Sequence, residues 1–192
     1  ITVNSGAFAS FIDPNSVPEC SPHTSAFINN SQAAVSYLWD FGDGNTSTEF
    51  APTHVYENNT TLVGFFTASL IAYSTGECHD TTEQTIVVFP SATFNIDFNS
   101  FTGCSPVEIP MPLLTGAAEF HWIFGDGAES FEALPTHIYQ TTLPIDTFEV
   151  SFIGTSVFGC TDTTHSSVII LGGPTASFSI DHTDGCEPAS VV

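Results

Sequence analysis

The sequence repeats itself with an offset of 83 residues. Segment 37–44 has the pattern aromatic-x-Trp-x-Phe-Gly-Asp-Gly, and this pattern returns at 120–127. Segment 52–56 has the pattern Pro-Thr-His-x-Tyr, which returns at 135–139. A period slightly above 80 residues is too long for one unit of a solenoid and is typical of one small β-sandwich domain. The chain is therefore predicted to contain successive copies of one domain.

The register of the repeats predicts four segments. Residues 1–3 match 86–88 and 169–171, the expected last strands of two full copies, and residues 175–180 match the start of the second copy at 91–96. We therefore expect the end of a preceding repeat at 1–4, full repeats at 5–89 and 90–172, and the start of a further repeat at 173–192. On this interpretation the sequence is a window onto a longer protein, and the partner of Cys186 lies beyond Val192.

Within each copy the hydrophobic pattern has a period of two. Segments 37–41, 66–72, 120–124 and 148–154 place an aromatic, aliphatic or small residue at every second position. Such alternation marks half-buried strands, and Gly-Asp-Gly supplies a tight turn after each Trp strand. About seven strands around one buried Trp per copy predict an all-β fold of tandem immunoglobulin-like β-sandwich domains. Short links between the copies predict a semi-rigid rod.

The cysteines recur in step with the repeats. Cys20 and Cys104 open the two full copies, and Cys78 and Cys160 close them. The matched positions predict two disulfides, Cys20 with Cys78 and Cys104 with Cys160. Each would stabilise its own domain by about 4 kcal/mol in the chain-entropy estimate. Disulfides imply an oxidising compartment outside the cytoplasm, so we expect an extracellular or cell-surface location.

The charge balance excludes several classes of function. The chain has no Lys and no Arg against 21 Asp and Glu, for a formal net charge of −21. Without Lys or Arg side chains the protein cannot neutralise phosphates. We therefore expect neither binding to nucleic acid nor attraction to an anionic membrane. The sequence contains no run of 18 apolar residues, so no membrane-spanning segment is predicted. The missing cations fit a surface without trypsin sites, adaptation to salty water, or a selected fragment.

Each candidate for site chemistry has a structural interpretation that fits better. The carboxylates of the Gly-Asp-Gly turns are interpreted as turn-stabilising, because an EF-hand needs Asp at alternate positions and a closing Glu. Each domain offers one recurrent His in the Pro-Thr-His segment, too few for zinc, so these His are predicted to be packed or hydrogen-bonded. No nucleophile elbow or phosphate loop is present. We expect no catalytic residue, no metal, no cofactor and no enzyme. The predicted structural residues are Trp39, Asp43, His54, Tyr56, Trp122, Asp126, His137 and Tyr139.

These motifs together resemble the polycystic-kidney-disease (PKD) repeat. The resemblance rests on Trp-Asp-Phe-Gly-Asp-Gly at 39–44, on Pro-x-His-x-Tyr at 52–56, and on a closing strand rich in Val and Leu. The Gly-Cys-Ser-Pro start at 103–106 and the Gly-Cys-x-Asp-Thr close at 159–163 are similar to the subtype found in arrays on Bacteroidetes cell surfaces. The second copy departs from the pattern at Ile123, which stands where the first has Asp40. The resemblance implies extracellular spacing, adhesion, filament building, or an accessory role beside a secreted enzyme.

The subtype also implies a modification. Asp-Thr-Thr at 80–82 and at 162–164 matches the O-glycosylation acceptor pattern known for Bacteroidetes. Thr81 and Thr163 are therefore possible O-glycosylation sites, and the alternative is that they simply line the last strand.

Two functions are compared. The first is a structural or adhesive repeat segment of a long cell-surface or filament-forming protein, a disulfide-stapled spacer whose partners are further repeats, other copies of itself, or surface proteins and polysaccharide. Eighteen Phe predict exposed apolar patches for such contacts. The alternative is a polysaccharide- or protein-binding accessory module of a secreted hydrolase, which would need a row of exposed Trp or Tyr.

Overall fold

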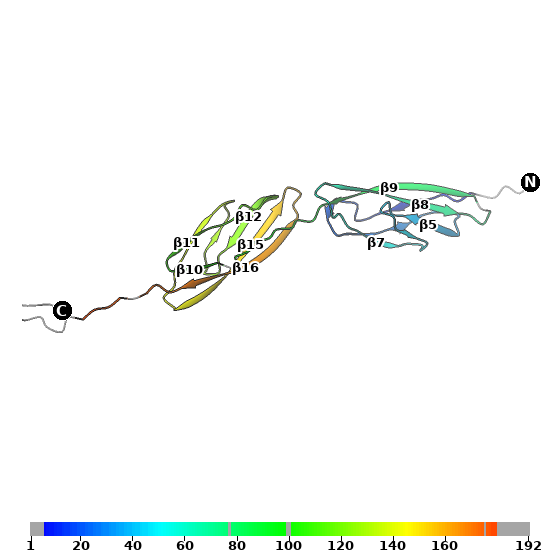
Figure 1. Ribbon diagram of the computed structural model, residues 1–192. Coiled ribbons are helices and arrows are strands. Elements are labelled where there is room, and N and C mark those ends of the chain that lie inside the picture. Colours follow the sequence, from blue (N-terminus) through cyan, green and yellow to red (C-terminus); the bar gives the residue numbers. More distant parts are fainter. Residues whose placement is uncertain (1–5, 77, 99–100, 175, 180–192) are drawn as a thin grey trace, which may run out of the picture.

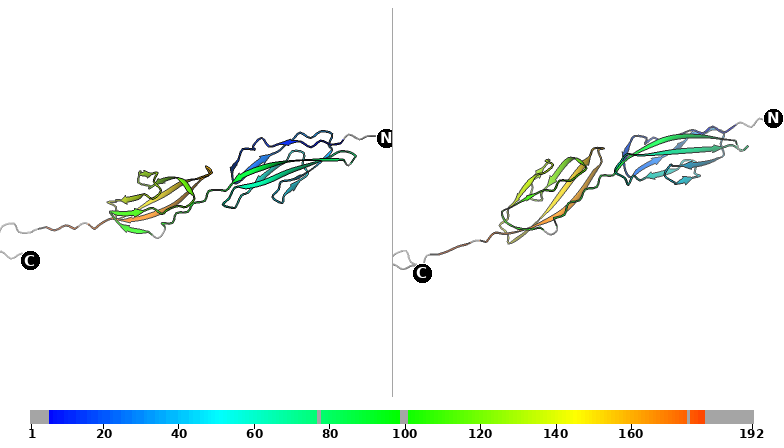
Figure 2. Two further views of the ribbon diagram at one scale, coloured as in Figure 1. Left: turned by 90° about the horizontal axis from the view of Figure 1, so that it is seen from above. Right: turned by 45° about the horizontal axis from the view of Figure 1, so that its top comes forward.

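The computed structural model describes residues 6–76, 78–98, 101–174 and 176–179. Two β-sandwiches lie end to end and give the molecule an elongated shape (Figures 1 and 2). All regular structure in this described part is β-structure, and none of its residues lies in a helix that could span a membrane. The predicted fold class is therefore confirmed.

The first repeat pairs a five-stranded sheet with two small two-stranded sheets. The five-stranded sheet has the order β2-β9-β8-β5-β6, and the others are β1-β4 and β3-β7. All pairs are antiparallel except β2 with β9. The strands are β1 (Phe11–Ile12), β2 (Glu19–Cys20), β3 (His23–Ala26), β4 (Ile28–Asn29), β5 (Ser36–Asp40), β6 (Thr46–Ser47), β7 (Thr53–Tyr56), β8 (Gly64–Tyr73) and β9 (His79–Phe89).

The second repeat has the same five-stranded sheet and, among the described residues, one two-stranded sheet in place of two. Its five-stranded sheet has the order β10-β16-β15-β12-β13 and faces the β11-β14 pair, again with one parallel pair, β10 with β16. The strands are β10 (Thr102–Cys104), β11 (Val107–Pro110), β12 (Ala117–Ile123), β13 (Glu129–Ser130), β14 (Thr136–Tyr139), β15 (Ile145–Ser156) and β16 (Thr161–Leu171).

Alternating burial along the long strands builds one core in each repeat. Along β8, Ala68, Leu70 and Ala72 are fully buried, and the residues between them are only partly buried. Trp39 and Trp122 occupy the centres of the two cores with no exposed surface. Burial of one large apolar side chain stabilises a fold by roughly 1.5–3 kcal/mol, so these cores hold each sandwich together.

The offset between the repeats shortens from 83 to 82 residues before the last two long strands. Cys20 lies beside Phe89, and its counterpart Cys104 lies beside Leu171. The final strand of the first repeat therefore aligns one residue away from the match of 86–88 with 169–171 that the sequence suggested. The segment from Tyr139 to Phe152 is one residue shorter than the segment from Tyr56 to Leu70, where Leu70 and Phe152 are the partners of the two core Trp.

The two predicted disulfides within the repeats are wrong. Cys20 lies beside Phe89 at one end of β9, whereas Cys78 directly precedes His79 at the other end. About ten residues of extended strand separate these ends by roughly 33 Å, and a disulfide requires Cα atoms less than about 7 Å apart. In the second repeat, Cys104 and Cys160 lie at the two ends of β16 in the same way.

Candidate functional site

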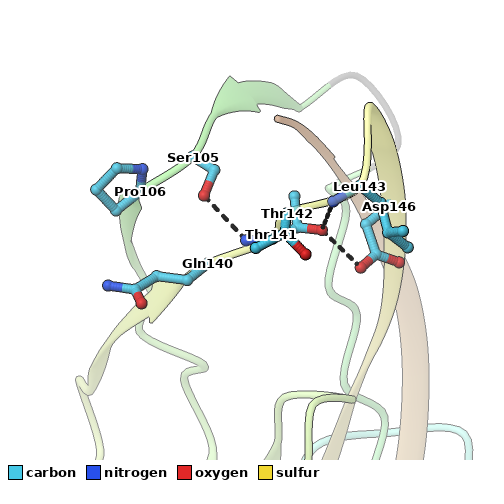
Figure 3. A pocket seen from close by; sticks show the side chains of 7 residues that line it. All are labelled: Ser105, Pro106, Gln140, Thr141, Thr142, Leu143 and Asp146. Carbon is cyan, nitrogen blue, oxygen red and sulfur yellow. Dashed lines mark hydrogen bonds between the residues drawn. The ribbon is translucent and has the colours of Figure 1, made fainter. Parts of the chain in front are cut away.

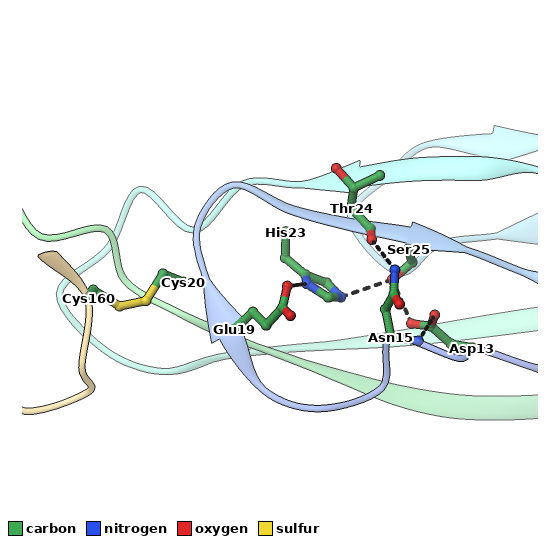
Figure 4. A network of polar contacts seen from close by, with 8 residues as sticks. All are labelled: Asp13, Asn15, Glu19, Cys20, His23, Thr24, Ser25 and Cys160. Carbon is green, nitrogen blue, oxygen red and sulfur yellow. Dashed lines mark hydrogen bonds and ion pairs between the residues drawn. A yellow bond between two sulfur atoms is a disulfide. The ribbon is translucent and has the colours of Figure 1, made fainter.

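The cysteines instead join the two repeats to each other. Cys20 of the first repeat forms a disulfide with Cys160 of the second, with a Cα–Cα distance of 5.7 Å (Figure 4). Cys20 comes from the end of β2, and Cys160 comes from the turn that connects β15 to β16. Cys160 is 2% exposed, so the bridge is covered on the side of the second repeat. The candidate functional site is this junction.

Two further features shape the junction. The rings of Phe89 and Phe158 stack across it, with centroids 5.1 Å apart and planes 19° apart. The turn that carries Cys160 is closed by two hydrogen bonds: the Ser156 amide donates to the Cys160 carbonyl at 2.8 Å, and the Cys160 amide donates to the Ser156 hydroxyl at 3.3 Å. A covalent bond and an aromatic contact therefore connect the two sandwiches.

A buried polar network lies directly behind Cys20, and the sequence analysis missed it. His23 Nδ1 lies 3.1 Å from a Glu19 carboxylate oxygen, and His23 Nε2 lies 3.2 Å from the Ser25 hydroxyl (Figure 4). The Ser25 hydroxyl donates to Asp13 at 2.7 Å. Asp13, His23 and Ser25 are each at most 4% exposed. The alternation of His23 and Ser25 along a strand was the signal that could have revealed the network.

The network resembles an acid–histidine–serine arrangement, but its geometry suits a structural role. Ser25 has no exposed surface, and its proton goes to Asp13 rather than to His23. At the same register in the second repeat stand Val107 and Ile109. These apolar side chains occupy the same place in an equivalent domain. The network therefore connects the segment that leads to Cys20 with strand β3.

The Gly-Asp-Gly turn is tied to the Pro-Thr-His strand in both repeats. His54 Nε2 donates to Asp43 at 2.7 Å, and the Asn45 amide donates to the same carboxylate at 3.0 Å. The His54 ring also stacks on Phe41, with centroids 4.1 Å apart and planes 3° apart. Burial acts to raise the pKa of Asp43, but the hydrogen bonds from His54 and Asn45 outweigh it and hold the pKa below its ordinary value of 3.8.

The second repeat has the same turn contact. His137 Nε2 donates to Asp126 at 2.7 Å and stacks on Phe124 with centroids 4.1 Å apart. Burial again acts to raise the pKa of Asp126, and the bonds from Ala128 and His137 lower it overall. One bond has no counterpart: Asp40 accepts from the Gly42 amide at 2.9 Å, and Ile123 cannot. Within the described residues, no cluster of three or more His, Cys, Asp or Glu could hold a metal ion.

The buried aromatic residues make their polar contacts differently in the two repeats. Trp39 Nε1 donates to the Glu49 carbonyl at 2.9 Å, and the Tyr139 hydroxyl donates to the Phe124 carbonyl at 2.9 Å. Among the residues that the structure describes, the Tyr56 hydroxyl and Trp122 Nε1 have no hydrogen-bond partner. The same core position is therefore satisfied in one repeat and unsatisfied in the other.

This asymmetry predicts opposite results for one substitution at the two Tyr. Tyr139→Phe removes a buried hydrogen bond and leaves a carbonyl unpaired, so the free energy of unfolding of the second repeat should fall by about 1–2 kcal/mol. Tyr56→Phe removes only an unpaired hydroxyl and should leave the first repeat unchanged or slightly more stable. Urea unfolding of both variants measures the difference, and an equal cost at both positions would contradict it.

A shallow hollow lies at the far end of the second repeat, next to Cys104 (Figure 3). The Ser105 hydroxyl accepts from the Thr141 amide at 2.9 Å, and Thr141 Oγ1 donates to Asp146 at 3.1 Å. In the first repeat the Ser21 hydroxyl accepts from the Asn58 amide at 2.8 Å in the same way. The hollow is lined by Ser105, Pro106, Gln140, Thr141, Thr142, Leu143 and Asp146.

The two possible O-glycosylation residues lie exposed on the last strand of each repeat. Thr81 is on β9 and Thr163 is on β16, and their modification remains a prediction. The Asp before each Thr has a structural contact: Asp80 accepts from the Ala9 amide at 2.9 Å, and Asp162 accepts from the Phe94 amide at 2.7 Å. These bonds hold the first segment of each repeat against its last strand. The predicted boundary segments 1–4 and most of 173–192, with Cys186, lie outside the described residues.

Comparison with known proteins identifies similar domains in bacterial proteases. Residues 12–88 match the sequence model of the family described as "PKD domain". Over 54 residues, 28% of this chain, the sequence is 46% identical to Collagenase ColQ1 of Bacillus cereus (strain Q1) and 48% identical to Pre-pro-metalloprotease PrtV of Vibrio cholerae serotype O1 (strain M66-2). The chain spans 5% of each of these relatives.

A solved structure matches over the length of one repeat. It is the crystal structure of the PKD1 domain from the Vibrio cholerae metalloprotease PrtV, with 34% sequence identity and a TM-score of 0.36. The match covers 44% of this chain and 99% of that domain.

Proposed function

This chain belongs to the PKD domain family. We propose that its two repeats form a non-catalytic extracellular spacer, and that the disulfide between the repeats fixes their orientation relative to each other. The observation that carries the proposal is the Cys20–Cys160 bridge, which ties neighbouring domains together rather than stapling each one internally. A bridge across a junction limits how far two domains can bend relative to each other. A domain stapled internally would remain free to swing on its linker.

The charge of the chain supports a covalent junction. With no Lys or Arg and a net charge of −21, neighbouring domains repel each other and cannot be joined by Lys or Arg ion pairs. Every ion pair among the described residues uses a His. Salt screens repulsion only beyond a Debye length of about 8 Å at physiological ionic strength. A disulfide and an apolar ring contact hold the junction without any cation.

The proposal includes adhesive contacts, whose partners are further repeats or other copies of this chain. Exposed aromatic rings support these contacts. Large apolar side chains on the surface are available for contacts with a neighbour. Five Phe residues are each more than half exposed: Phe8, Phe50, Phe65, Phe131 and Phe178. The O-glycosylation of Thr81 and Thr163 is part of the same proposal, since both residues are exposed on the last strand of their repeats.

The test measures bending at the junction in the full chain. With Cys20→Ser, small-angle X-ray scattering should change from the profile of one straight rod to that of an ensemble of bent rods, because the linker and one ring stack alone then connect the domains. The matched control is Cys78→Ser, which removes an exposed thiol outside the junction and should leave the profile unchanged. Identical profiles for Cys20→Ser and the unchanged protein would overturn the proposal.

A second candidate function is an accessory module of a secreted hydrolase. The relatives that favour it are named as a collagenase and a metalloprotease. Both Trp are fully buried and cannot form the exposed row that sugar stacking needs, although Phe131 is 71% exposed and stacks on His121. Retention of the protein on insoluble collagen or polysaccharide would favour this candidate over the first.

A further inference from the structure

Each of the two exposed thiols lies at the position in its repeat that is equivalent to a bonded cysteine in the other repeat. Cys78 and Cys104 are free and exposed. Cys104 is the repeat counterpart of Cys20, and Cys78 is the counterpart of Cys160. The bonded pair therefore shows what each free thiol is positioned to do.

The opening cysteines share one backbone environment. Cys20 lies beside Phe89 in a parallel pair, and the next amide, that of Ser21, donates to the Phe89 carbonyl at 2.9 Å. Cys104 lies beside Leu171 in a parallel pair, and the Ser105 amide donates to the Leu171 carbonyl at 2.8 Å. The last strand of each repeat thus holds the opening cysteine at the end from which the chain leaves toward the following repeat.

The closing cysteines share a second environment at the opposite end. The Ser74 amide donates to the Cys78 carbonyl at 2.8 Å, as the Ser156 amide does to the Cys160 carbonyl. Both turns connect the two longest strands of their repeat: β8 to β9, and β15 to β16. Cys78 is therefore presented at the end of the first repeat that faces away from the junction.

Distance prevents the two free thiols from bonding to each other. Cys104 and Cys160 lie at opposite ends of β16, and Cys78 and Cys20 lie at opposite ends of β9. The repeats are placed end to end (Figure 1). Cys78 directly precedes β9 and Cys104 lies beside the last residue of β16, so the two thiols lie at the two outer ends of the rod. The Cys104 thiol is exposed, and the next residue, Ser105, lines the open hollow of Figure 3.

We propose that Cys78 and Cys104 are half-sites of further disulfides between repeats. Cys104 bonds the closing cysteine of a PKD repeat that follows, and Cys78 bonds the opening cysteine of a PKD repeat that precedes. The pairing rule is that the opening cysteine of each repeat bonds the closing cysteine of the next, as Cys20 bonds Cys160. The inference rests on the proposed spacer function and extends it, since a continuous series of such bridges gives a rod that is covalently tied at every junction.

The chemistry is thiol oxidation. Two thiols lose two protons and two electrons as the S–S bond forms, and a small-molecule disulfide such as oxidised glutathione accepts them and is reduced to two thiols. The thiolate of one cysteine attacks the small disulfide and forms a mixed disulfide. The thiolate of the second cysteine then displaces the remaining glutathione thiol.

The test lengthens the full chain by one domain. A second copy of residues 90–172 is inserted after Gly172 in a Cys186→Ser background, and the protein is oxidised in glutathione buffer. The added copy carries Cys104→Ser and Thr161→Ser, so that its cysteine peptide differs in mass from that of the first copy; Thr161 is exposed next to Cys160. Free thiols are alkylated and the protein is digested with pepsin, because the chain has no Lys or Arg for trypsin to cut. Mass spectrometry should find two cross-linked peptide pairs, Cys20–Cys160 and Cys104 with the closing cysteine of the added copy, and an alkylated Cys78.

The control variant also carries Cys104→Ser in the first copy of residues 90–172. It should lose the second cross-link completely, keep Cys20–Cys160, and show the closing cysteine of the added copy alkylated. If Cys104 is alkylated in the lengthened chain that retains it while Cys20–Cys160 forms, the inference is overturned and the spacer function stands. If Cys20–Cys160 is also absent, or if Cys20 bonds the added copy, both are overturned.

Discussion

Gly42→Ala is expected to destabilise the first repeat by about 2–5 kcal/mol. Gly42 has φ of +79°, a conformation that costs an L-residue roughly 1–2 kcal/mol. A Cβ at this position would also lie 2.6 Å from the carbonyl oxygen of Thr67, which belongs to the backbone of β8. The neighbouring strand cannot move away without breaking its own pairing, and such overpacking typically costs a further 1–3 kcal/mol.

The matched control lies two residues away in the same turn. Gly44 has φ of +94°, but a Cβ there would meet no atom within 4 Å. Gly44→Ala should therefore cost only the conformational penalty, about 1–2 kcal/mol. Urea unfolding followed by hydrogen exchange of backbone amides separates the two repeats and measures both values. If the two variants are equally stable, the close approach of Thr67 has no energetic weight.

Ser25→Ala is expected to destabilise the first repeat by about 2–4 kcal/mol. The change leaves the buried carboxylate of Asp13 without its 2.7 Å hydroxyl donor, and His23 Nε2 loses its 3.2 Å contact. Asp13 keeps the 3.0 Å bond from the Asn15 amide, but its second oxygen stays buried without a donor. Loss of the donor to a buried polar atom costs about 1–3 kcal/mol, and more where the atom is charged. Thermal unfolding of the oxidised protein measures the loss.

Ser36→Ala provides the comparison for that experiment. Ser36 lies exposed at the start of β5 in the same repeat, so its substitution should change the free energy of unfolding by no more than about 0.5 kcal/mol. A cost at Ser25 as small as the cost at Ser36 would mean that the network behind Cys20 contributes nothing to stability. Because the network supports the segment that carries Cys20, the Ser25 variant should also form the Cys20–Cys160 bridge more slowly during refolding.

Local patterns predicted the fold because the physics behind them is local. Alternation along 37–41 and 148–154 indicated strands, and the central Trp of each repeat is fully buried. The Gly-Asp-Gly pattern indicated a turn that needs Gly, and Gly42 and Gly125 have positive φ. The buried network of Asp13, His23 and Ser25 was not predicted, because no copy of it in the second repeat drew attention to those residues.

The sequence by itself determined that the chain consists of like β-sandwiches with one Trp core each, since side-chain alternation and turn residues act over a few positions. It also determined which cysteines are equivalent. Only the tertiary structure decided which cysteines are partners, because the last strand of each repeat carries Cys20 and Cys78, or Cys104 and Cys160, to opposite ends of the sandwich. Equivalence along the chain says nothing about distance in space, and the end-to-end packing of the repeats places Cys20 against Cys160.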